Sequence, residues 1–422
     1  MADPARDAAL EALRRVFTQG AFAGAALRGI LGPGLDDRDR GLATELVYGV
    51  LRRRVHLDKA ISALGRRLKD IDPKLHDVLR LAAYQLLFLD RIPAHAAVSA
   101  AVDQARARRG EGGAKQTNAM LRKLSEIPKE SRLPPPPPFA KDPIAHLAFA
   151  GGLPRALAEQ LASDLGAQKA LEFAVKCLDR APLVLRVNAL KTTREALLAE
   201  VDGTAGAHPL AVHLPERLGA VPADLLPVAE GRATPQDEAS MRVVDLLAPE
   251  PGESILDVCA APGGKTTAIA ERMGDRGTVL AHDRALEKLP GIRESARRLG
   301  LHIIETIEVL PEPGRLFDRV LVDAPCSGLG TLRRHPEIRW RFEAADIDRL
   351  ARTQASVLSE AAARTKVGGT LVYSVCTVTR REGIEVAERA IPGFARIETL
   401  STSPSEPGAP DGFFAVKWRR ER

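Results

Sequence analysis

Residues 254–267 have the sequence Ser-Ile-Leu-Asp-Val-Cys-Ala-Ala-Pro-Gly-Gly-Lys-Thr-Thr. An apolar run of strand length leads into a turn with two glycines and then into residues that can begin a helix, which predicts a strand–loop–helix unit. Glycines let the backbone of such a turn approach a ligand closely, and the helix N-terminus presents unpaired N–H groups to polar or anionic atoms. This stretch therefore predicts a ligand site.

Two kinds of ligand compete for this turn. Gly264-Lys265-Thr266 matches the end of the phosphate-loop pattern G-x-x-x-x-G-K-[ST], but Cys259 stands where that pattern requires its first glycine. The other candidate is a nucleoside cofactor at the first strand of a doubly wound sheet, where an acid roughly 20 residues further on takes the ribose hydroxyls. Residues 278–282 predict a second strand, and Asp283 follows it. The pattern favours the nucleoside cofactor, and a P-loop nucleotidase is the weaker alternative.

Two later strands end in a similar way. An apolar segment at 318–322 runs into Asp-Ala-Pro-Cys-Ser-Gly at 323–328, and another at 370–375 runs into Cys376 and Thr377. Open α/β sheets bind ligands at the edge formed by the carboxyl ends of their strands. Both cysteines are therefore expected on the edge that carries the first turn.

These segments resemble three signature motifs of the RNA cytosine-C5 methyltransferases that use S-adenosylmethionine. The motifs are Cys-Ala-Ala-Pro-Gly-Gly-Lys-Thr-Thr at 259–267, Asp-Ala-Pro-Cys-Ser-Gly at 323–328 and Tyr-Ser-Val-Cys-Thr at 373–377. Within that family the chain is most similar to the bacterial Sun/RsmB type, which acts on small-subunit (16S) ribosomal RNA. The resemblance implies an α/β fold, a Rossmann-like class I methyltransferase with a mostly parallel seven-stranded sheet, and S-adenosylmethionine as cofactor.

The resemblance also assigns residues to the cofactor and to the reaction. Cofactor-binding residues are expected at Cys259, Ala260, Ala261, Pro262, Gly263, Gly264, Lys265, Asp283 and Asp323. Cys376 is expected to add to C6 of cytosine, Cys326 to assist proton removal and product release, and Asp323 to hold the edge of the base. Pro325-Cys326 also resembles the Pro-Cys pair of the DNA cytosine-C5 methyltransferases, in which that cysteine attacks, so the reverse assignment stays open.

The N-terminal part of the chain has a helical pattern from about residue 5 to 125, which predicts an all-α domain. Tyr-Gln-Leu-Leu at 84–87 and Arg-Ile-Pro-Ala-His at 91–95 resemble the NusB-like domain that precedes the catalytic part in the Sun/RsmB group. The expected role is RNA docking, with Arg52, Arg53 and Arg54 contacting phosphates. A solvated basic face on a packing domain is the alternative.

The boundary of that domain is expected at a run of five consecutive prolines, 134–138, which favours an extended and stiff spacer. The predicted organisation is an all-α NusB-like RNA-binding domain at 1–130, a proline-rich linker at 131–142, a small RNA-facing subdomain at 143–235 and the methyltransferase domain at 236–422.

Candidates for RNA contact fall in two places. Arg186 and Asn188 form an Arg-x-Asn segment that in the family belongs to the RNA-facing subdomain, and a purely structural capping role is the alternative. Residues 331–341 interleave arginines with an indole, which offers phosphate contacts and a stacking surface. The candidates in this second segment are Arg333, Arg334, Arg339 and Trp340.

Composition sets the remaining expectations. A net charge of +6 and a pI near 9.2 suit a nucleic-acid partner without requiring one. The four cysteines are too scattered for a disulfide framework or a zinc site, and no stretch reaches the ~20 apolar residues that span a bilayer. We expect a cytoplasmic monomer with an RNA partner, no metal and no membrane association. A non-catalytic RNA-binding or ribosome assembly factor is the alternative from another functional class.

Two positions depart from the family pattern. Thr306 stands where an acid usually meets the adenine of the cofactor, and Gly383 replaces the asparagine that usually follows a glutamate, here Glu382. The first departure puts the adenine contact in doubt, and the second is expected to affect local hydrogen bonding.

Overall fold

The computed structural model describes residues 3–32, 34–65, 68–215, 225–389, 391–404 and 409–422. Its N-terminal part is helical and is built around one apolar core that draws on every long helix of the region. The helices are α1 (Pro4–Gln19), α2 (Ala23–Arg28), α3 (Asp37–Ala63), α4 (Pro73–Phe88) and α5 (Ala94–Glu126). Aspartates are the N-cap residues of α1, α3 and α4: the side chains of Asp3, Asp36 and Asp72 accept hydrogen bonds from first-turn N–H groups.

A second helical unit follows a short connection that contains the 3₁₀ helix η2 (Lys129–Ser131) and the extended proline run. Its helices are α6 (Pro143–Ala150), α7 (Arg155–Leu165) and α8 (Ala167–Lys176). Their apolar faces pack on Leu329 and Leu332, which come from the segment after the second motif. This three-helix unit therefore supports the segment that carries several predicted RNA contacts.

A small antiparallel sheet comes next, with strand order β2-β3-β1-β4. Its strands are β1 (Leu183–Val187), β2 (Thr204–Ala205), β3 (Ala211–Leu214) and β4 (Ala233–Pro235), and the short helices α9 (Arg194–Val201) and α10 (Leu226–Ala229) accompany it. The range predicted as one small subdomain, 143–235, thus consists of two units of different architecture, three helices and a sheet.

The C-terminal part is an α/β domain with a seven-stranded sheet of order β10-β11-β9-β8-β5-β6-β7. Its strands are β5 (Ser254–Asp257), β6 (Thr278–His282), β7 (Ile304–Ile307), β8 (Phe317–Asp323), β9 (Thr365–Val375), β10 (Phe394–Thr402) and β11 (Phe413–Arg420). All pairs from β7 to β9 are parallel, while β11 pairs antiparallel with both β9 and β10. The predicted fold class, a mostly parallel seven-stranded sheet after an all-α region, is confirmed.

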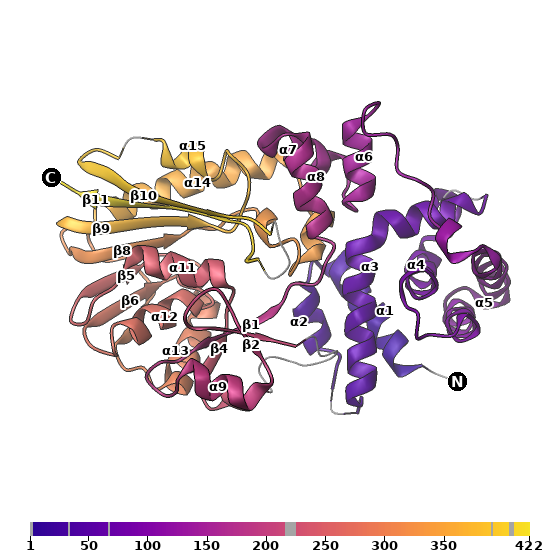
Figure 1. Cartoon of the computed structure of the whole chain (residues 1–422), viewed down its shortest axis with the longest axis horizontal. Helices are drawn as coiled ribbons and strands as arrows, with labels where there is room; N and C mark the ends of the chain where they lie inside the picture. The colour runs from indigo at the N-terminus through magenta and orange to yellow at the C-terminus, as the bar shows by residue number, and fades with distance from the viewer. Residues whose placement is uncertain (1–2, 33, 66–67, 216–224, 390, 405–408) are drawn as a thin grey trace.

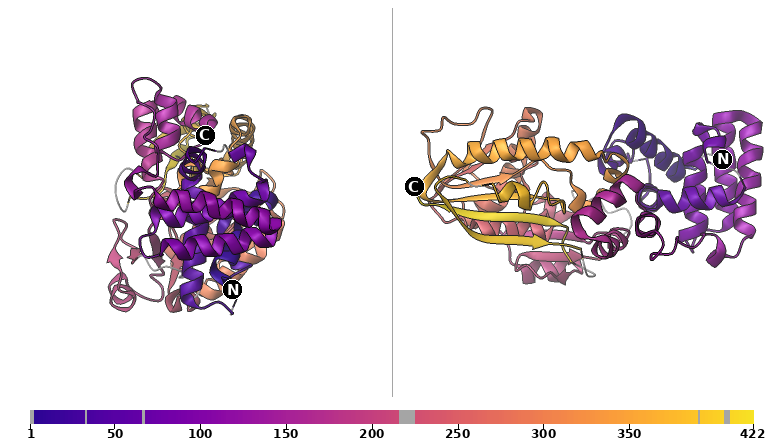
Figure 2. Two further views of the ribbon diagram at one scale, coloured as in Figure 1. Left: turned by 90° about the vertical axis from the view of Figure 1, so that its right-hand side faces the viewer. Right: turned by 90° about the horizontal axis from the view of Figure 1, so that it is seen from above.

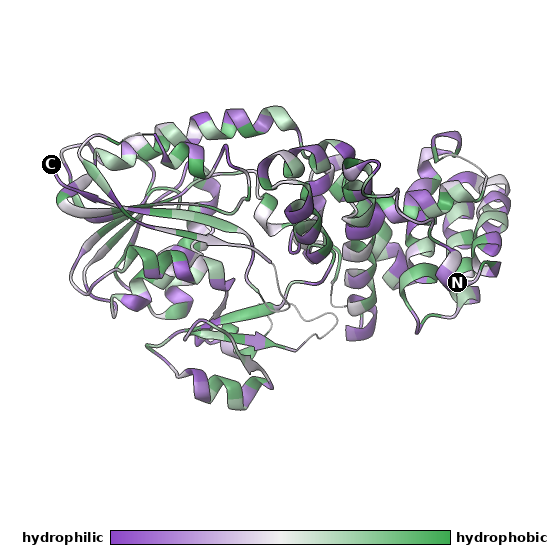
Figure 3. Cartoon of the chain, turned by 45° about the horizontal axis from the view of Figure 1, so that its top comes forward, coloured by the Kyte–Doolittle hydropathy of each residue, from purple (hydrophilic) through white to green (hydrophobic). Residues whose placement is uncertain are grey.

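Helices cover both faces of this sheet because its strands are apolar on both sides. Along β5, Ile255 faces α11 (Glu238–Leu247), α12 (Gly264–Arg272) and α13 (Leu289–Leu299), whereas Leu256 faces the other layer. That other layer is formed by α14 (Ala344–Ala362) and α15 (Ile384–Ala387). Figure 1 shows the two helical layers on opposite sides of the strands, and Figure 3 shows apolar strands between helices whose outer surfaces are polar.

The molecule is elongated, with the N-terminal helices at one end and the seven-stranded sheet at the other (Figures 1 and 2). Helices α6 to α8 lie between them, and the termini lie near the two opposite ends. Across the residues that the structure describes, no helix is both long and apolar enough to cross a membrane.

Candidate active site

The turn after β5 has the shape of a ligand cradle. Gly263 caps α12 with a left-handed backbone (φ 104°), and a Cβ at this position would lie 3.2 Å from a side-chain carbon of Ile292. The turn is fixed from the neighbouring strand, because Asp283 after β6 accepts a hydrogen bond of 2.9 Å from the Ala261 N–H. Asp283 is therefore placed beside the turn, as the spacing predicts for an acid that meets a cofactor ribose.

Asp257, the last residue of β5, is a site residue that sequence reasoning missed. It is 1% exposed, it accepts a hydrogen bond of 2.8 Å from the Thr266 hydroxyl, and its other oxygen has no partner among the described residues. Burial raises the pKa of its carboxyl to about 7. The sequence shows this acid at the end of an apolar run, but no motif singles it out and its burial is visible only in the fold.

Two thiols meet where β8 and β9 end. The strands are parallel neighbours in which Asp323 pairs with Ser374, so the turns that follow them bring Cys326 and Cys376 together. The two sulfur atoms lie 3.3 Å apart, and both cysteines are free. The structure thus brings together the two cysteines that the motifs single out.

The pKa of the Cys326 thiol is raised well above its usual value by its hydrogen bond with Cys376, by burial and by the negative charge of Glu382. Cys326 therefore holds its proton and can donate it toward the neighbouring sulfur. Cys259, in the cofactor turn, is different: burial raises its thiol pKa, followed by the nearby carboxylates of Asp257 and Asp323. It is held as a neutral thiol, which fits packing rather than nucleophilic chemistry.

Asp323 is held between two partners at the same sheet edge. The Lys265 ammonium lies 2.6 Å from one of its carboxylate oxygens, and the Ser374 hydroxyl donates to the other at 2.6 Å. Burial lowers the pKa of Lys265, but the Asp323 charge more than offsets this and the pKa is raised. Lys265, which resembles a phosphate-loop lysine in the sequence, therefore forms a charged pair with the aspartate beside the thiols.

Glu382 organises the site, a role that its position in the sequence did not indicate. It is fully buried, and its carboxylate accepts hydrogen bonds from the N–H and hydroxyl of Ser327, from Thr379 and from Gln354. Ser327 and Thr377, the residues after the two cysteines, are also bonded to each other through their hydroxyls at 2.8 Å. One buried carboxylate thus ties both cysteine-bearing turns together.

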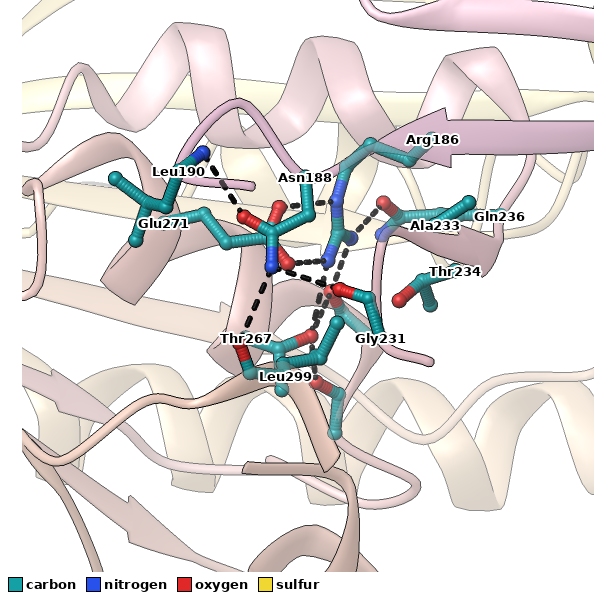
Figure 4. Close-up of polar contacts among 12 residues, drawn as sticks. Arg186, Asn188, Leu190, Gly231, Ala233, Thr234, Gln236, Thr267, Glu271 and Leu299 are labelled. Atoms are coloured by element: carbon teal, nitrogen blue, oxygen red, sulfur yellow. Dashed lines mark hydrogen bonds and ion pairs between the residues drawn. The ribbon is translucent and has the colours of Figure 1, made fainter. Parts of the chain in front are cut away.

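The predicted RNA contacts at Arg186 and Asn188 have internal roles instead (Figure 4). Arg186 is 2% exposed and pairs with both carboxylate oxygens of Glu271, at 2.8 and 3.0 Å, while donating to the Gly264 carbonyl at 2.8 Å. Asn188 is fully buried and donates to the carbonyls of Gly231 and Leu299. These side chains join the small sheet to α12 and α13, so RNA cannot reach them in this conformation.

Arg333 and Arg334 are also occupied within the protein. Arg333 is buried and pairs with Asp411 at 3.2 Å. Arg334 bridges Asp411 and Asp237, at 2.7 and 2.6 Å, and donates to the Pro182 carbonyl at 2.8 Å. Two carboxylates from distant parts of the chain neutralise both guanidinium groups, so internal ion pairs engage both arginines and their contact with RNA stays a prediction.

Arg339 and Trp340 lie against the N-terminal helices. Arg339 is 1% exposed and donates to the carbonyls of Leu332 and Cys177, both at 2.8 Å. The Trp340 indole N–H donates to the Leu51 carbonyl in α3 at 2.9 Å, and the Arg54 guanidinium lies 4.7 Å from the Trp340 ring. The segment predicted to grip RNA is thus largely the contact between the catalytic part and the helical part.

The departure at Thr306 leaves a hydroxyl near the cofactor edge. Thr306 lies in β7, the outermost strand beside β6, and its hydroxyl accepts a hydrogen bond of 2.7 Å from Arg293.

Among the described residues, no group of three or more His, Cys, Asp or Glu side chains is arranged to hold a metal ion.

A cavity of about 480 Å³ gives access to both sulfurs. Besides Cys326 and Cys376, its lining includes apolar side chains such as Ile338 and Phe342 and the polar rim residues His335 and Arg341. Its volume lies in the range of sites that hold small organic groups. A planar base that enters this cavity would meet both thiols.

Comparison with known proteins supports the family and domain resemblances over most of the chain. Residues 244–411 match the family described as 16S rRNA methyltransferase RsmB/F, and residues 3–126 match the NusB family. The chain is 36% identical to a probable ribosomal RNA small subunit methyltransferase B of Bacillus subtilis, over 90% of this chain and 86% of that protein. It is 32% identical to ribosomal RNA small subunit methyltransferase B of Klebsiella pneumoniae, over 99% of this chain and 98% of the relative.

A solved structure has the same fold over the full length. The crystal structure of PH0851 superposes with a TM-score of 0.80 at 24% identity and covers 100% of this chain and 99% of its own. The helical part and the methyltransferase-like sheet therefore occur together in a known arrangement.

Proposed function

The chain belongs to the RsmB/F family of 16S ribosomal RNA methyltransferases, which use S-adenosylmethionine, and from this premise we propose that it methylates C5 of a cytosine through a covalent bond between Cys376 and C6. The observation that carries the proposal is the pair of free thiols 3.3 Å apart at adjoining strand ends. Methylation of an amine or a ribose hydroxyl needs no thiol pair, whereas C5 needs a nucleophile to activate it and a second group to take its proton.

The turn after β5 fits the cofactor. Gly263 lets the turn pack closely on α13, since a Cβ there would lie 3.2 Å from Ile292, and Asp257, Asp283 and Asp323 stand at or just after the ends of β5, β6 and β8. We propose that Asp283 accepts hydrogen bonds from the ribose, and that the turn from Cys259 to Lys265 contacts the rest of the nucleoside through its backbone. When bound there, S-adenosylmethionine supplies an electrophilic methyl group.

The two thiols have different roles in this mechanism. A thiol proton on Cys326 stabilises the Cys376 thiolate by hydrogen bonding, and that thiolate adds to C6, which makes C5 enamine-like. Asp323, oriented by Lys265 and Ser374, holds the N3 and amine edge of the base as charge shifts.

Proton removal follows from the same pair. Once the Cys376 sulfur is bonded to carbon, its hydrogen bond and its charge no longer raise the pKa of Cys326, and burial and Glu382 are the causes that remain. Cys326 can then lose its proton to solvent and take the proton from methylated C5. Loss of that proton re-forms the C5–C6 double bond, breaks the sulfur–carbon bond and returns Cys376 as a thiolate.

The test is product analysis with 16S ribosomal RNA transcribed without modifications. We expect the protein to incorporate labelled methyl groups that appear, after digestion to nucleosides, as 5-methylcytidine. Methyl groups found on a ribose, a base nitrogen or another base would contradict the proposed chemistry. Cys177→Ala serves as a control, because Cys177 is a buried cysteine outside the site and its loss should leave the product unchanged.

We further propose that the protein acts as a monomer, because one chain supplies both thiols and the proposed cofactor turn, and that it is cytoplasmic, because the proposed substrate is ribosomal RNA. Light scattering with and without RNA tests the monomer.

A further inference from the structure

The cavity over the two thiols is not built by the catalytic part alone. Phe22, which precedes α2 in the N-terminal helical part, lines it together with Cys326, Cys376 and several residues between His335 and Leu350. Phe22 is 50% exposed. Among the residues that the structure describes, the other exposed large hydrophobic side chains are all aliphatic. An aromatic ring from the helical part therefore stands at the entrance to the proposed reaction pocket. Figure 1 shows α2 on the side of the helical part that faces the catalytic part.

The position of Phe22 is fixed from both sides. The Ala21 carbonyl accepts a hydrogen bond from Arg341, and the Ala23 N–H donates to the Glu337 carboxylate at 3.0 Å. The ring itself has an edge-on contact with His335, with centroids 5.6 Å apart, and the Arg341 guanidinium lies 5.1 Å from its centroid. The ring is thus held in place before any substrate arrives, which lowers the entropy cost of binding against it.

A single exposed apolar side chain needs no functional explanation on its own. Phe22 differs because of where it lies and what surrounds it. A target cytosine must leave its stack to meet both sulfurs, so its neighbours in the strand are unstacked as well. Proteins hold unstacked bases on aromatic rings and guanidinium planes, and Phe22 and Arg341 supply one of each beside the cavity.

We propose that Phe22 stacks on a base next to the target cytosine in unpaired RNA, so that the helical part completes the substrate pocket. This inference rests on the proposed function for the identity of the central base. Arg341 and Arg349 line the same cavity and add positive charge beside it, which suits the phosphates of a bound strand. Arg349 is paired with Asp346 at 2.8 Å, and Arg341 also donates to the Ala21 carbonyl.

The experiment compares Phe22→Ala, Phe22→Leu and Phe22→Trp in the full-length protein, with the unmodified 16S transcript as the probe. Base–aromatic stacking strength predicts that Phe22→Ala and Phe22→Leu each raise the Kd for RNA, and the KM for methyl transfer, by roughly 5- to 150-fold. Phe22→Trp should stay within about twofold of the wild-type protein, because an indole stacks as well as a phenyl ring. Affinity for S-adenosylmethionine should not change in any variant.

The leucine variant separates stacking from packing. Leucine fills most of the same space without a π face, so RNA binding by Phe22→Leu equal to that of the wild type would overturn the proposal. It would also be overturned if Phe22→Trp bound as weakly as Phe22→Ala. Leu226→Ala is the matched control, because Leu226 is 60% exposed in α10 and does not line the cavity.

Failure of the proposed function is visible separately. If the wild-type protein forms no 5-methylcytidine, the proposed reaction is wrong. The order of the Kd values for RNA among the Phe22 variants still shows whether Phe22 stacks on a base. If the wild type does form it and all variants bind RNA equally, the reaction stands and the stacking is rejected.

Discussion

The chemistry of the candidate site depends on single side chains that two neighbouring strands deliver to one edge. Parallel strands end side by side, so the turns after Asp323 and Val375 bring two sulfurs to 3.3 Å of each other. The two thiols have different surroundings. The hydrogen bond with Cys376, burial and the charge of Glu382 raise the pKa of Cys326, so this thiol retains its proton.

Glu382→Gln tests whether the buried carboxylate positions the thiols. Glutamine replaces one acceptor oxygen with an amide donor that faces the donors Ser327 and Thr379, which leaves buried polar groups unpaired. We expect the free energy of unfolding to fall by about 1–3 kcal/mol, and kcat to fall about 10- to 100-fold as the sulfurs shift. Urea denaturation and methyl-transfer kinetics provide the two readouts. Glu385→Gln, in a partly exposed ion pair with Arg381, should change neither by much.

Asp257 makes folding stability depend on pH. Its folded-state pKa is raised to about 7 from 3.8, so between these values the folded protein binds more protons than the unfolded chain. Its contribution to stability is therefore present at low pH and is lost as pH rises toward 7. The stability of Asp257→Asn relative to wild type should increase between pH 5 and pH 8, measured by thermal unfolding at each pH. A difference that stays constant with pH would contradict a raised pKa.

At the scale of elements, the strands and helices were largely predictable and their joints were not. Apolar runs in β5, β6, β8 and β9, followed by a glycine turn, an acid or a cysteine, indicate a doubly wound sheet. The environment of Arg186 depends on Glu271, which lies 85 residues further along the chain, and no local pattern reports that pairing. A buried arginine and an RNA-binding arginine look alike until the partner is placed.

Arg186→Ala tests the joint between the small sheet and the methyltransferase domain. Removal of one partner leaves the Glu271 carboxylate buried and uncompensated, so we expect the free energy of unfolding to fall by about 3–5 kcal/mol. Arg232→Ala is the matched control, because its pairs with Glu200 and Glu230 are more exposed and should contribute about 1 kcal/mol or less. If Arg186→Ala kept its stability and lost only RNA affinity, the arginine would be an RNA contact as the sequence first suggested.

For the molecule as a whole, the helical part and the catalytic part meet along residues 333–341. The motif of arginines and an indole predicted a nucleic-acid surface, since the same residue types serve both RNA and protein interfaces. What the sequence could not show is that α3 covers this segment: Arg54, predicted to contact phosphate, lies between the rings of Phe17 and Trp340. Phe22 and the half-buried Arg341 are the aromatic and basic groups at the cavity, and no local sequence pattern marks Phe22 as part of it.

Trp340→Ala should loosen the contact between the two parts. The indole loses its hydrogen bond to the Leu51 carbonyl and its packing on the helical core, at a cost of up to about 3 kcal/mol. We expect faster proteolysis within 127–142 and a larger radius of gyration by X-ray scattering, with unchanged affinity for S-adenosylmethionine. Trp340→Phe keeps most of the packing, so its proteolysis rate and radius of gyration should lie between those of the wild type and of Trp340→Ala. Scattering identical to wild type for both variants would show that other contacts hold the parts together.

In the proposed reaction, Cys376 attacks C6 of the cytosine and Cys326 allows release of the methylated RNA. The most direct measurement is to incubate Cys326→Ala and Cys376→Ala separately with unmodified 16S RNA and S-adenosylmethionine, and to look for a protein–RNA adduct on a denaturing gel. We expect an adduct with Cys326→Ala, which can form the sulfur–carbon bond but cannot resolve it, and none with Cys376→Ala. An adduct with Cys376→Ala alone would reverse the two roles, and the absence of an adduct in both would contradict covalent catalysis.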